Sequence, residues 1–198
     1  MKINVYLDCG GHYGEGLREF IQTHNITDDW IVETFEPNPE CRFVDRISDV
    51  KLKNLTTHNK AVWISDGEIK FSQENHIKSN SKSPNDGRSN IDGWGSVITE
   101  LCSTHLKYSE EPIVVQCVDF HRILLKYPKD KFNVIVKLDI EGAEYRVLKH
   151  VISCGSAVNM SELYVEWHHV DLVDENISTT NNLINTLSMI GVNVKNWK

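Results

Sequence analysis

The chain has 198 residues, of which 40% are hydrophobic and 25% are charged. These values are ordinary for a globular protein and exclude collagen-like, low-complexity and wholly disordered chains. Acidic residues outnumber basic ones, 28 to 21, which opposes broad binding to nucleic-acid phosphates. A chain of this length can bury about 70% of the surface that its unfolded form exposes, so we expect one domain over residues 1–198.

The sequence also bears on the compartment. It has no apolar run long enough to span a membrane, and its first residues lack the apolar stretch of a signal peptide. The five cysteines are widely spaced without a C-x-x-C pair, so neither a zinc knot nor a disulfide framework is indicated. We therefore expect a cytoplasmic protein with no membrane partner, and the oligomeric state stays open.

The first part of the chain alternates strand-like and helix-like segments. Residues 3–7 predict a strand, and residues 15–24 carry apolar side chains at helical spacing. Residues 31–35 predict a second strand, after which the Pro-Asn-Pro at 37–39 forces a turn and can open a helix. In residues 60–71 an Asp-Gly pair separates two alternating apolar runs, which predicts a β-hairpin.

The second part begins with residues 72–95, which are polar and nearly free of aliphatic side chains, so we expect a mobile loop. Asp119 is placed to cap a helix. Strands are predicted at 113–118, 132–138 and 162–167, helices at 143–152 and 181–190, and a last strand from Val192. This alternation favours an α/β fold with a doubly wound, mostly parallel sheet.

Four of the predicted strands are followed by acidic residues. The segments are 8–16, 36–38, 139–144 and 166–169. Ligands of open parallel α/β sheets bind beyond the carboxyl ends of the strands. Because solvation alone explains such a coincidence poorly, we expect the functional site at this edge.

The first two of these segments favour a nucleoside. Glycines 10, 11 and 14 let the backbone approach a ligand, in a D-x-G-x-x-x-G pattern that differs from the G-x-G-x-x-G of dinucleotide folds. S-adenosylmethionine has no phosphate and carries a cationic amino group and a sulfonium, so Asp8 favours it. A tight turn without a ligand is the alternative. Glu36 follows Gly14 by 22 residues, about where Rossmann-like folds bind a ribose diol.

The third and fourth segments gather carboxylates and histidines. Asp139, Glu141 and Glu144 repel one another unless a cation or hydrogen-bond donors compensate. In one interpretation Glu144 caps a helix and Glu141 is solvated; in the other Asp139 lies beside the cofactor's methionine end or the substrate hydroxyl. In the fourth segment His168 could act as a general base near neutral pH, whereas His169 fits a solvated loop residue.

Four motifs follow one another in an order known from one enzyme family. They are VYLDCGGHYGEG, TFEPNP, KAVWISDGEIKF and VKLDIEGAEYRVLK. Over about residues 4–168 the chain resembles the FkbM-type S-adenosylmethionine-dependent methyltransferases. The D-I-E-G-A-E element is fairly specific, whereas the glycine loop alone is not. The resemblance implies a Rossmann-like class I methyltransferase fold and methyl transfer to a hydroxyl of a small molecule or sugar.

The resemblance also implies binding roles for individual residues. Glu36 would meet the ribose of S-adenosyl-L-methionine, and Asn38 and Ala61 the adenine side. Ser96 and Asp139 would lie near the methyl donor. Asp8, Gly10 and Gly14 would line the methionine end, and His12 of the same loop would also bind the cofactor. The chain stops soon after the predicted sixth strand, so we leave open whether the antiparallel last strand of the usual sheet is present.

An alcohol is a poor nucleophile, so an O-methyltransferase needs a base or a metal. We prefer Asp139 and His168 as catalytic residues and keep Glu141 and Glu166 as further candidates. Asp139, Glu166 and His168 could hold a divalent metal, but the sequence shows no tight ligand spacing. We therefore expect no metal and keep this trio as the weaker alternative.

Three other functions stay open. Gly10, Gly14 and Gly16 with Tyr145 and Lys149 also fit a short-chain NAD(P)-dependent dehydrogenase, but the serine that this family needs is missing. A methyltransferase-like binding domain without turnover is possible. RNA 2′-hydroxyl methylation is disfavoured by the acidic charge and by the lack of an aromatic and basic platform.

Overall fold

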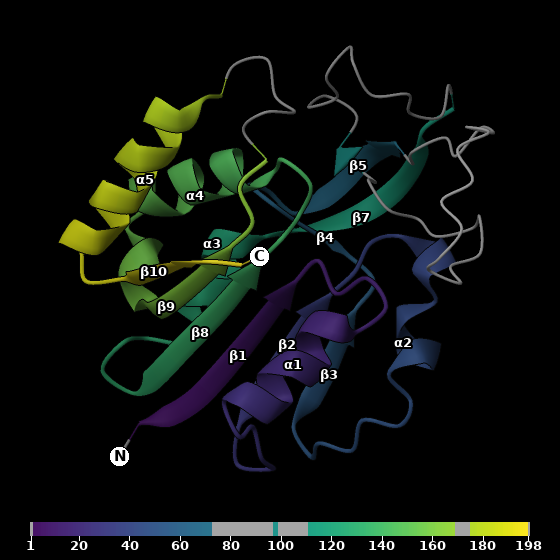
Figure 1. Cartoon of the computed structure of the whole chain (residues 1–198). Coiled ribbons are helices and arrows are strands. Elements are labelled where there is room, and N and C mark those ends of the chain that lie inside the picture. Colours follow the sequence, from purple (N-terminus) through teal and green to yellow (C-terminus); the bar gives the residue numbers. More distant parts are fainter. Residues whose placement is uncertain (1, 73–96, 99–110, 169–174, 198) are drawn as a thin grey trace, which may run out of the picture.

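A computed structural model describes residues 2–72, 97–98, 111–168 and 175–197 of the chain (Figure 1). The loop predicted at 72–95 lies outside the described residues except for residue 72, and so do Ser96 and His169. Among the residues that the structure describes, no helix combines the length and the apolar character that crossing a bilayer requires.

The central sheet has six strands, all parallel, in the order β10-β9-β8-β1-β2-β3 (Figure 1). Their bounds are β1 Ile3–Cys9, β2 Ile31–Phe35, β3 Leu55–His58, β8 Phe132–Leu138, β9 Met160–Val165 and β10 Asn193–Asn196. The chain adds β2 and β3 on one side of β1, then β8, β9 and β10 on the other. The strand order therefore reverses between β1 and β8, which is where doubly wound sheets bind ligands.

Helices cover both faces of this sheet because its strands are apolar on both sides. Tyr6 of β1 packs with Leu17 and Phe20 of α1 (Glu15–Thr23), whereas its neighbours Val5 and Leu7 belong to the larger core on the opposite face. That second face is covered by α3 (Phe120–Leu125), α4 (Glu144–Ser153) and α5 (Ile177–Met189). The predicted doubly wound α/β fold is confirmed.

A second, smaller sheet corrects the predicted hairpin at 60–71. It consists of β4 (Ala61–Trp63), β5 (Gly67–Ser72), β6 (Val97–Ile98) and β7 (Ile113–Asp119) in the order β4-β7-β5-β6. β7 lies between β4 and β5, and its Cys117 is the register partner of both Ala61 and Gly67. The hairpin prediction is wrong because β7 pairs with both β4 and β5 and separates them. At the turn, the Asp66 carboxylate accepts from the backbone N–H of Asp119 (3.0 Å).

The remaining predicted elements are present with shifted ends. Asn38 caps the short 3₁₀ helix η1 (Pro39–Cys41), which α2 (Phe43–Arg46) follows, and Asp119 caps α3 as predicted. Asn176 accepts from two backbone N–H groups and starts α5 four residues earlier than its apolar pattern indicates. Another 3₁₀ helix, η3 (Ser156–Asn159), leads into β9. β9 ends at Val165, so residues 166–167 lie after the strand rather than within it.

Candidate functional site

The glycine loop after β1 passes between the ends of two neighbouring strands. The backbone N–H groups of Gly10 and Gly11 both donate to the carbonyl of Phe35 at the end of β2 (3.0 Å each). Gly10 has φ +86°, and a Cβ placed there would lie 1.7 Å from the backbone oxygen of Asp139 after β8. Only glycine fits this position, because the loop lies directly against the β8 end.

Glu36 joins the glycine loop to the turn after β2. Its buried carboxylate accepts from the backbone N–H groups of His12 and Asn38, each at 2.7 Å. Burial raises the pKa of Glu36 above its usual value, although the two backbone hydrogen bonds favour the charged form. Each carboxylate oxygen retains a second lone pair, so the group can still accept from a ligand hydroxyl.

Lys137 is a central residue that the sequence reasoning missed. Its buried ammonium donates to the carbonyl of Gly10 (2.6 Å), lies 3.0 Å from a carboxylate oxygen of Asp139 and 3.7 Å from one of Asp8. Burial lowers the pKa of Lys137, but the two carboxylates outweigh it and raise the pKa overall. The available signal was a single lysine inside the nearly continuous apolar run FNVIVKL.

Asp8 lies beneath the glycine loop rather than on its surface. Its side chain is fully buried, and neither carboxylate oxygen has a hydrogen-bond partner among the residues that the structure describes. Burial raises the pKa of Asp8 to about 6, against the opposing charge of Lys137. The raised pKa favours the charged form of Lys137 but the neutral form of Asp8. Lys137 faces two carboxylates and a carbonyl, whereas the Asp8 carboxylate faces only the more distant Lys137 among the described residues. The geometry supports Asp8 as an electrostatic partner of Lys137 below the loop.

Asp139 and Glu166 follow neighbouring strands. The Asp139 N–H donates to the carbonyl of Cys9 and the Glu166 N–H to that of Leu138, both at 3.1 Å, so the two turns continue the edge of the sheet. The pKa of Glu166 is raised by burial first and by the Asp139 carboxylate second. Two acids are thus held close together at the point where the strand order reverses.

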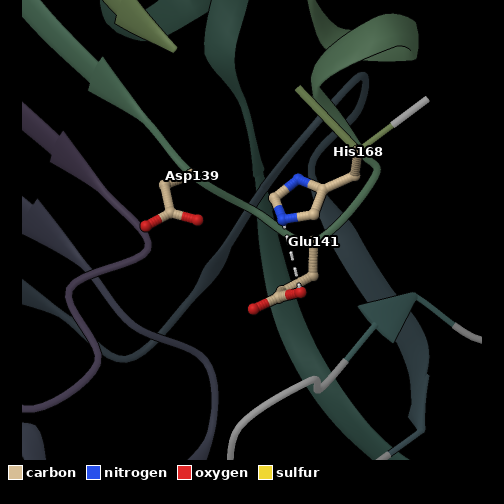
Figure 2. Close-up of side chains that lie close together, drawn as sticks. All are labelled: Asp139, Glu141 and His168. Atoms are coloured by element: carbon tan, nitrogen blue, oxygen red, sulfur yellow. Dashed lines mark ion pairs between the residues drawn. The ribbon is translucent and has the colours of Figure 1, made fainter. Parts of the chain in front are cut away.

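The turn before α4 holds a histidine in place. Glu144 is fully buried, accepts from the N–H groups of Ile140 (2.7 Å) and Gly142 (2.8 Å), and lies 3.1 Å from Nδ1 of His168. Nε2 of His168 points to Glu141, 3.6 Å away, as the dashed line in Figure 2 marks. The interpretation that Glu144 binds backbone at a helix start fits, but Glu141 is paired with His168 rather than merely solvated.

This pairing changes the expectation for His168. Burial opposes its protonation, but the hydrogen bond to Glu144 and the charges of Glu144, Glu141 and Asp139 raise the pKa of His168 to about 10. A histidine that is already protonated at neutral pH cannot accept a proton from a substrate. In the ligand-free protein the geometry therefore favours an anchoring role over that of a general base.

A family profile for the methyltransferase FkbM domain matches residues 8–188. The chain belongs to the FkbM methyltransferase domain family. Searches of curated proteins and of solved structures returned no match. Family membership confirms the expected resemblance and makes the chain a methyltransferase.

Of the binding residues that the FkbM resemblance implies, those of the glycine loop and of the turn after β2 lie together, whereas Ala61 lies in the larger core. Gly10, His12 and Gly14 share one loop with Glu36 beside it, and Asn38 donates its backbone N–H to Glu36. Ala61 is buried at the start of β4, three residues after β3 ends, where it belongs to the larger core. The binding roles of these residues stay predictions.

Tyr145 and Lys149, which would be catalytic in a short-chain dehydrogenase, do not form a catalytic site in this FkbM domain. The hydroxyl of Tyr145 is buried against Thr180 (2.7 Å), and Lys149 pairs with Glu175 (2.6 Å). Both side chains therefore serve the packing of α4 against α5. This is the helix-face interpretation that the sequence favoured.

The potential metal ligands also differ from the trio that the sequence offered as the weaker alternative to a site without metal. The ligand atoms of Asp139, Glu141 and His168 lie within 4.8 Å of one another, and Glu166 is not part of this group. Glu141 adopts a left-handed backbone conformation, with φ +54°, and its side chain is paired with His168. Glu166 instead lies close to the carboxylate of Asp139.

Proposed function

We propose that the chain is an S-adenosylmethionine-dependent O-methyltransferase that acts on a hydroxyl of a small molecule or a sugar. The observation that carries the proposal is the position of Glu36, a buried carboxylate at the end of β2 held by the N–H groups of His12 and Asn38. Such a fixed acceptor next to a glycine loop suits the two hydroxyls of a ribose.

The charge of this edge fits the donor. S-adenosylmethionine supplies an electrophilic methyl group on a sulfonium and carries no phosphate. Asp139 and Glu166 lie beside the glycine loop, and Asp8 adds a buried negative charge that Lys137 only partly offsets. This surplus of acid favours a cationic ligand over a pyrophosphate.

The same edge supplies proton acceptors for a hydroxyl. An alcohol must lose its proton as it attacks, and a positioned base lowers that barrier. Asp139, Glu141 and Glu166 are partly exposed carboxylates, whereas His168 is already ion-paired on both ring nitrogens. We infer that one of the carboxylates takes the proton while the chain aligns the acceptor oxygen with the methyl group.

Calorimetric titration with S-adenosylhomocysteine tests the binding part. The wild-type chain should bind it and should not bind NADP⁺. Glu36→Gln should weaken the affinity by about 10- to 100-fold, because a charge-assisted hydrogen bond contributes about 1.5–3 kcal/mol. Glu40→Gln, an exposed acid two residues past the Glu36–Asn38 turn, should leave the affinity unchanged. Equal affinity in wild type and Glu36→Gln would remove the basis of the proposal.

Transfer of an isotope-labelled methyl group from S-adenosylmethionine tests the reaction. Sugars and other hydroxylated acceptors should take up the label, and amine-bearing analogues should not. Label found on nitrogen alone would contradict the O-directed proposal. Tight cofactor binding with no transfer to any hydroxylated acceptor would favour a binding domain without turnover.

A further inference from the structure

Three side chains from two strand ends converge on one point at the acidic edge. Figure 2 shows Asp139 and Glu141 on the segment that follows β8, with the imidazole of His168 to the right of the Asp139 carboxylate and above that of Glu141. One ligand atom from each residue lies within 4.8 Å of the other two. Two ligands on opposite sides of one ion, each about 2.1 Å from it, lie about 4.2 Å apart, so small side-chain movements would close this set around a cation.

A buried carboxylate holds His168 at its Nδ1 side, an arrangement that is common for metal-binding histidines. Glu144 is fully buried and lies 3.1 Å from Nδ1 of His168, while its own oxygens accept from the backbone N–H groups of Ile140 and Gly142. This arrangement fixes the ring and directs Nε2 to the open side, toward Glu141. A carboxylate behind a histidine ligand is the usual outer partner of a protein-bound metal.

Asp139 is likewise held in place by a buried side chain, that of Lys137. Lys137 lies 3.0 Å from Oδ2 of Asp139, so the ammonium fixes the orientation of the carboxylate. The fixing groups, Glu144 and Lys137, are almost entirely buried, whereas Asp139, Glu141 and His168 are partly exposed. The rigid part of the cluster therefore lies in the core and the ligating part faces outward.

The charge of the cluster is unbalanced. Four carboxylates, those of Asp139, Glu141, Glu144 and Glu166, face two cationic side chains, Lys137 and His168, among the described residues. A divalent cation would offset the surplus. Two carboxylate oxygens and one imidazole nitrogen suit a first-row divalent ion such as Mn²⁺ better than the all-oxygen shell of Ca²⁺.

We propose that Asp139, Glu141 and His168 bind one divalent cation at the carboxyl edge of β8 and β9. The sequence predicted no metal, and its weaker alternative had Glu166 in the place that Glu141 takes here. The consequence of this site rests on the proposed function: the ion would bind the acceptor hydroxyl and help it lose its proton. Binding of the ion itself does not depend on that function.

Titration of the chelator-treated full chain with Mn²⁺, followed by the electron paramagnetic resonance signal of the free ion, tests the site. The measurement is made without any methyl donor. One ion should bind per chain, and Glu141→Gln and His168→Ala should each weaken binding by about 10-fold or more. His150→Ala is the matched control because His150 pairs with Asp119 in another part of the chain, and it should bind as the wild type does.

Folding of each variant is checked by its melting curve, and the partly exposed Glu141 provides the variant least expected to disturb the core. Absence of Mn²⁺ binding by the folded wild type overturns the proposal, as does unchanged binding in both folded site variants. Titration with S-adenosylhomocysteine in the presence of a chelator reports separately on the proposed function, so failure of one is distinguishable from failure of the other.

Discussion

Lys137 organises the charges beneath the candidate site. Its ammonium contacts the Gly10 carbonyl and the Asp139 carboxylate and is the cation nearest to the buried Asp8. A buried ion pair adds little net stability compared with an apolar pair, but removal of one partner leaves the other charge uncompensated. The residue therefore couples the stability of the fold to the position of the glycine loop.

Lys137→Met should destabilise the protein by about 3–5 kcal/mol at pH 7.5. The loss should shrink as the pH falls toward 5. The folded-state pKa of Asp8, already raised to about 6 from its ordinary 3.8, would rise further without Lys137. The folded state then binds the proton more tightly than the unfolded state, so protonation favours folding at low pH and this gain is lost as the pH rises. Urea denaturation at several pH values measures it.

Lys149→Met is the control, because the Lys149 side chain is half exposed, so water can replace its ammonium beside Glu175. That variant should lose less than about 1 kcal/mol, with little dependence on pH. If Lys137→Met proves too unstable to study, the Asp8→Asn/Lys137→Met double variant should recover stability. Equal losses in the two single lysine variants would show that Lys137 carries no special electrostatic role.

At the scale of elements, the glycine loop depends on the close approach of two strand ends. In Gly10→Ala, the alanine must adopt the left-handed backbone conformation of Gly10. Its Cβ would also lie 1.7 Å from the backbone oxygen of Asp139. We expect a loss of stability well above the roughly 1 kcal/mol that the backbone conformation alone costs. Thermal unfolding of Gly10→Ala and Gly155→Ala measures the difference.

Gly155 is a suitable comparison because it also has positive φ, +75°, and nothing lies within 4 Å of the position of its Cβ. Its variant should therefore show the conformational cost without the clash. Gly10→Ala should also shift Asp139 and weaken binding of S-adenosylhomocysteine. If the two alanine variants lose the same stability, the loop is not packed against the β8 end as described.

The elements also show what the sequence can predict. The apolar run 132–138 and the helical spacing of 143–152 are local patterns, and both elements appear nearly as expected. The hairpin at 60–71 failed because its signal is local, whereas the strand that separates β4 from β5 comes from residues 113–119. Pairing between distant strands overrode a favourable turn sequence.

Prediction of the site divides in the same way between what strand order gives and what distant contacts decide. The order of strands and turns was enough to bring Glu36, Asp139 and Glu166 to one edge. The roles of Lys137 and Glu144 depend on what lies across the sheet or behind a ring, and sequence spacing does not encode this. Single-domain organisation over 1–198 likewise stays a prediction.

In the whole molecule, the proposed function places methyl donor and acceptor where the strand order reverses between β1 and β8. Asp8 and the glycine loop come from one half of the sheet, and Asp139, Glu141, Glu166 and His168 from the other. A ligand across this boundary would join the two halves. Because it binds only the folded chain, it should also raise the melting temperature.

A crystal structure of the chain with S-adenosylhomocysteine would show where the ligand binds. We predict that the Glu36 carboxylate accepts from the ribose hydroxyls and that the sulfur lies beside Asp139, at the edge formed by β1, β2 and β8. A ligand bound elsewhere on the chain, or one whose ribose makes no contact with Glu36, would contradict it.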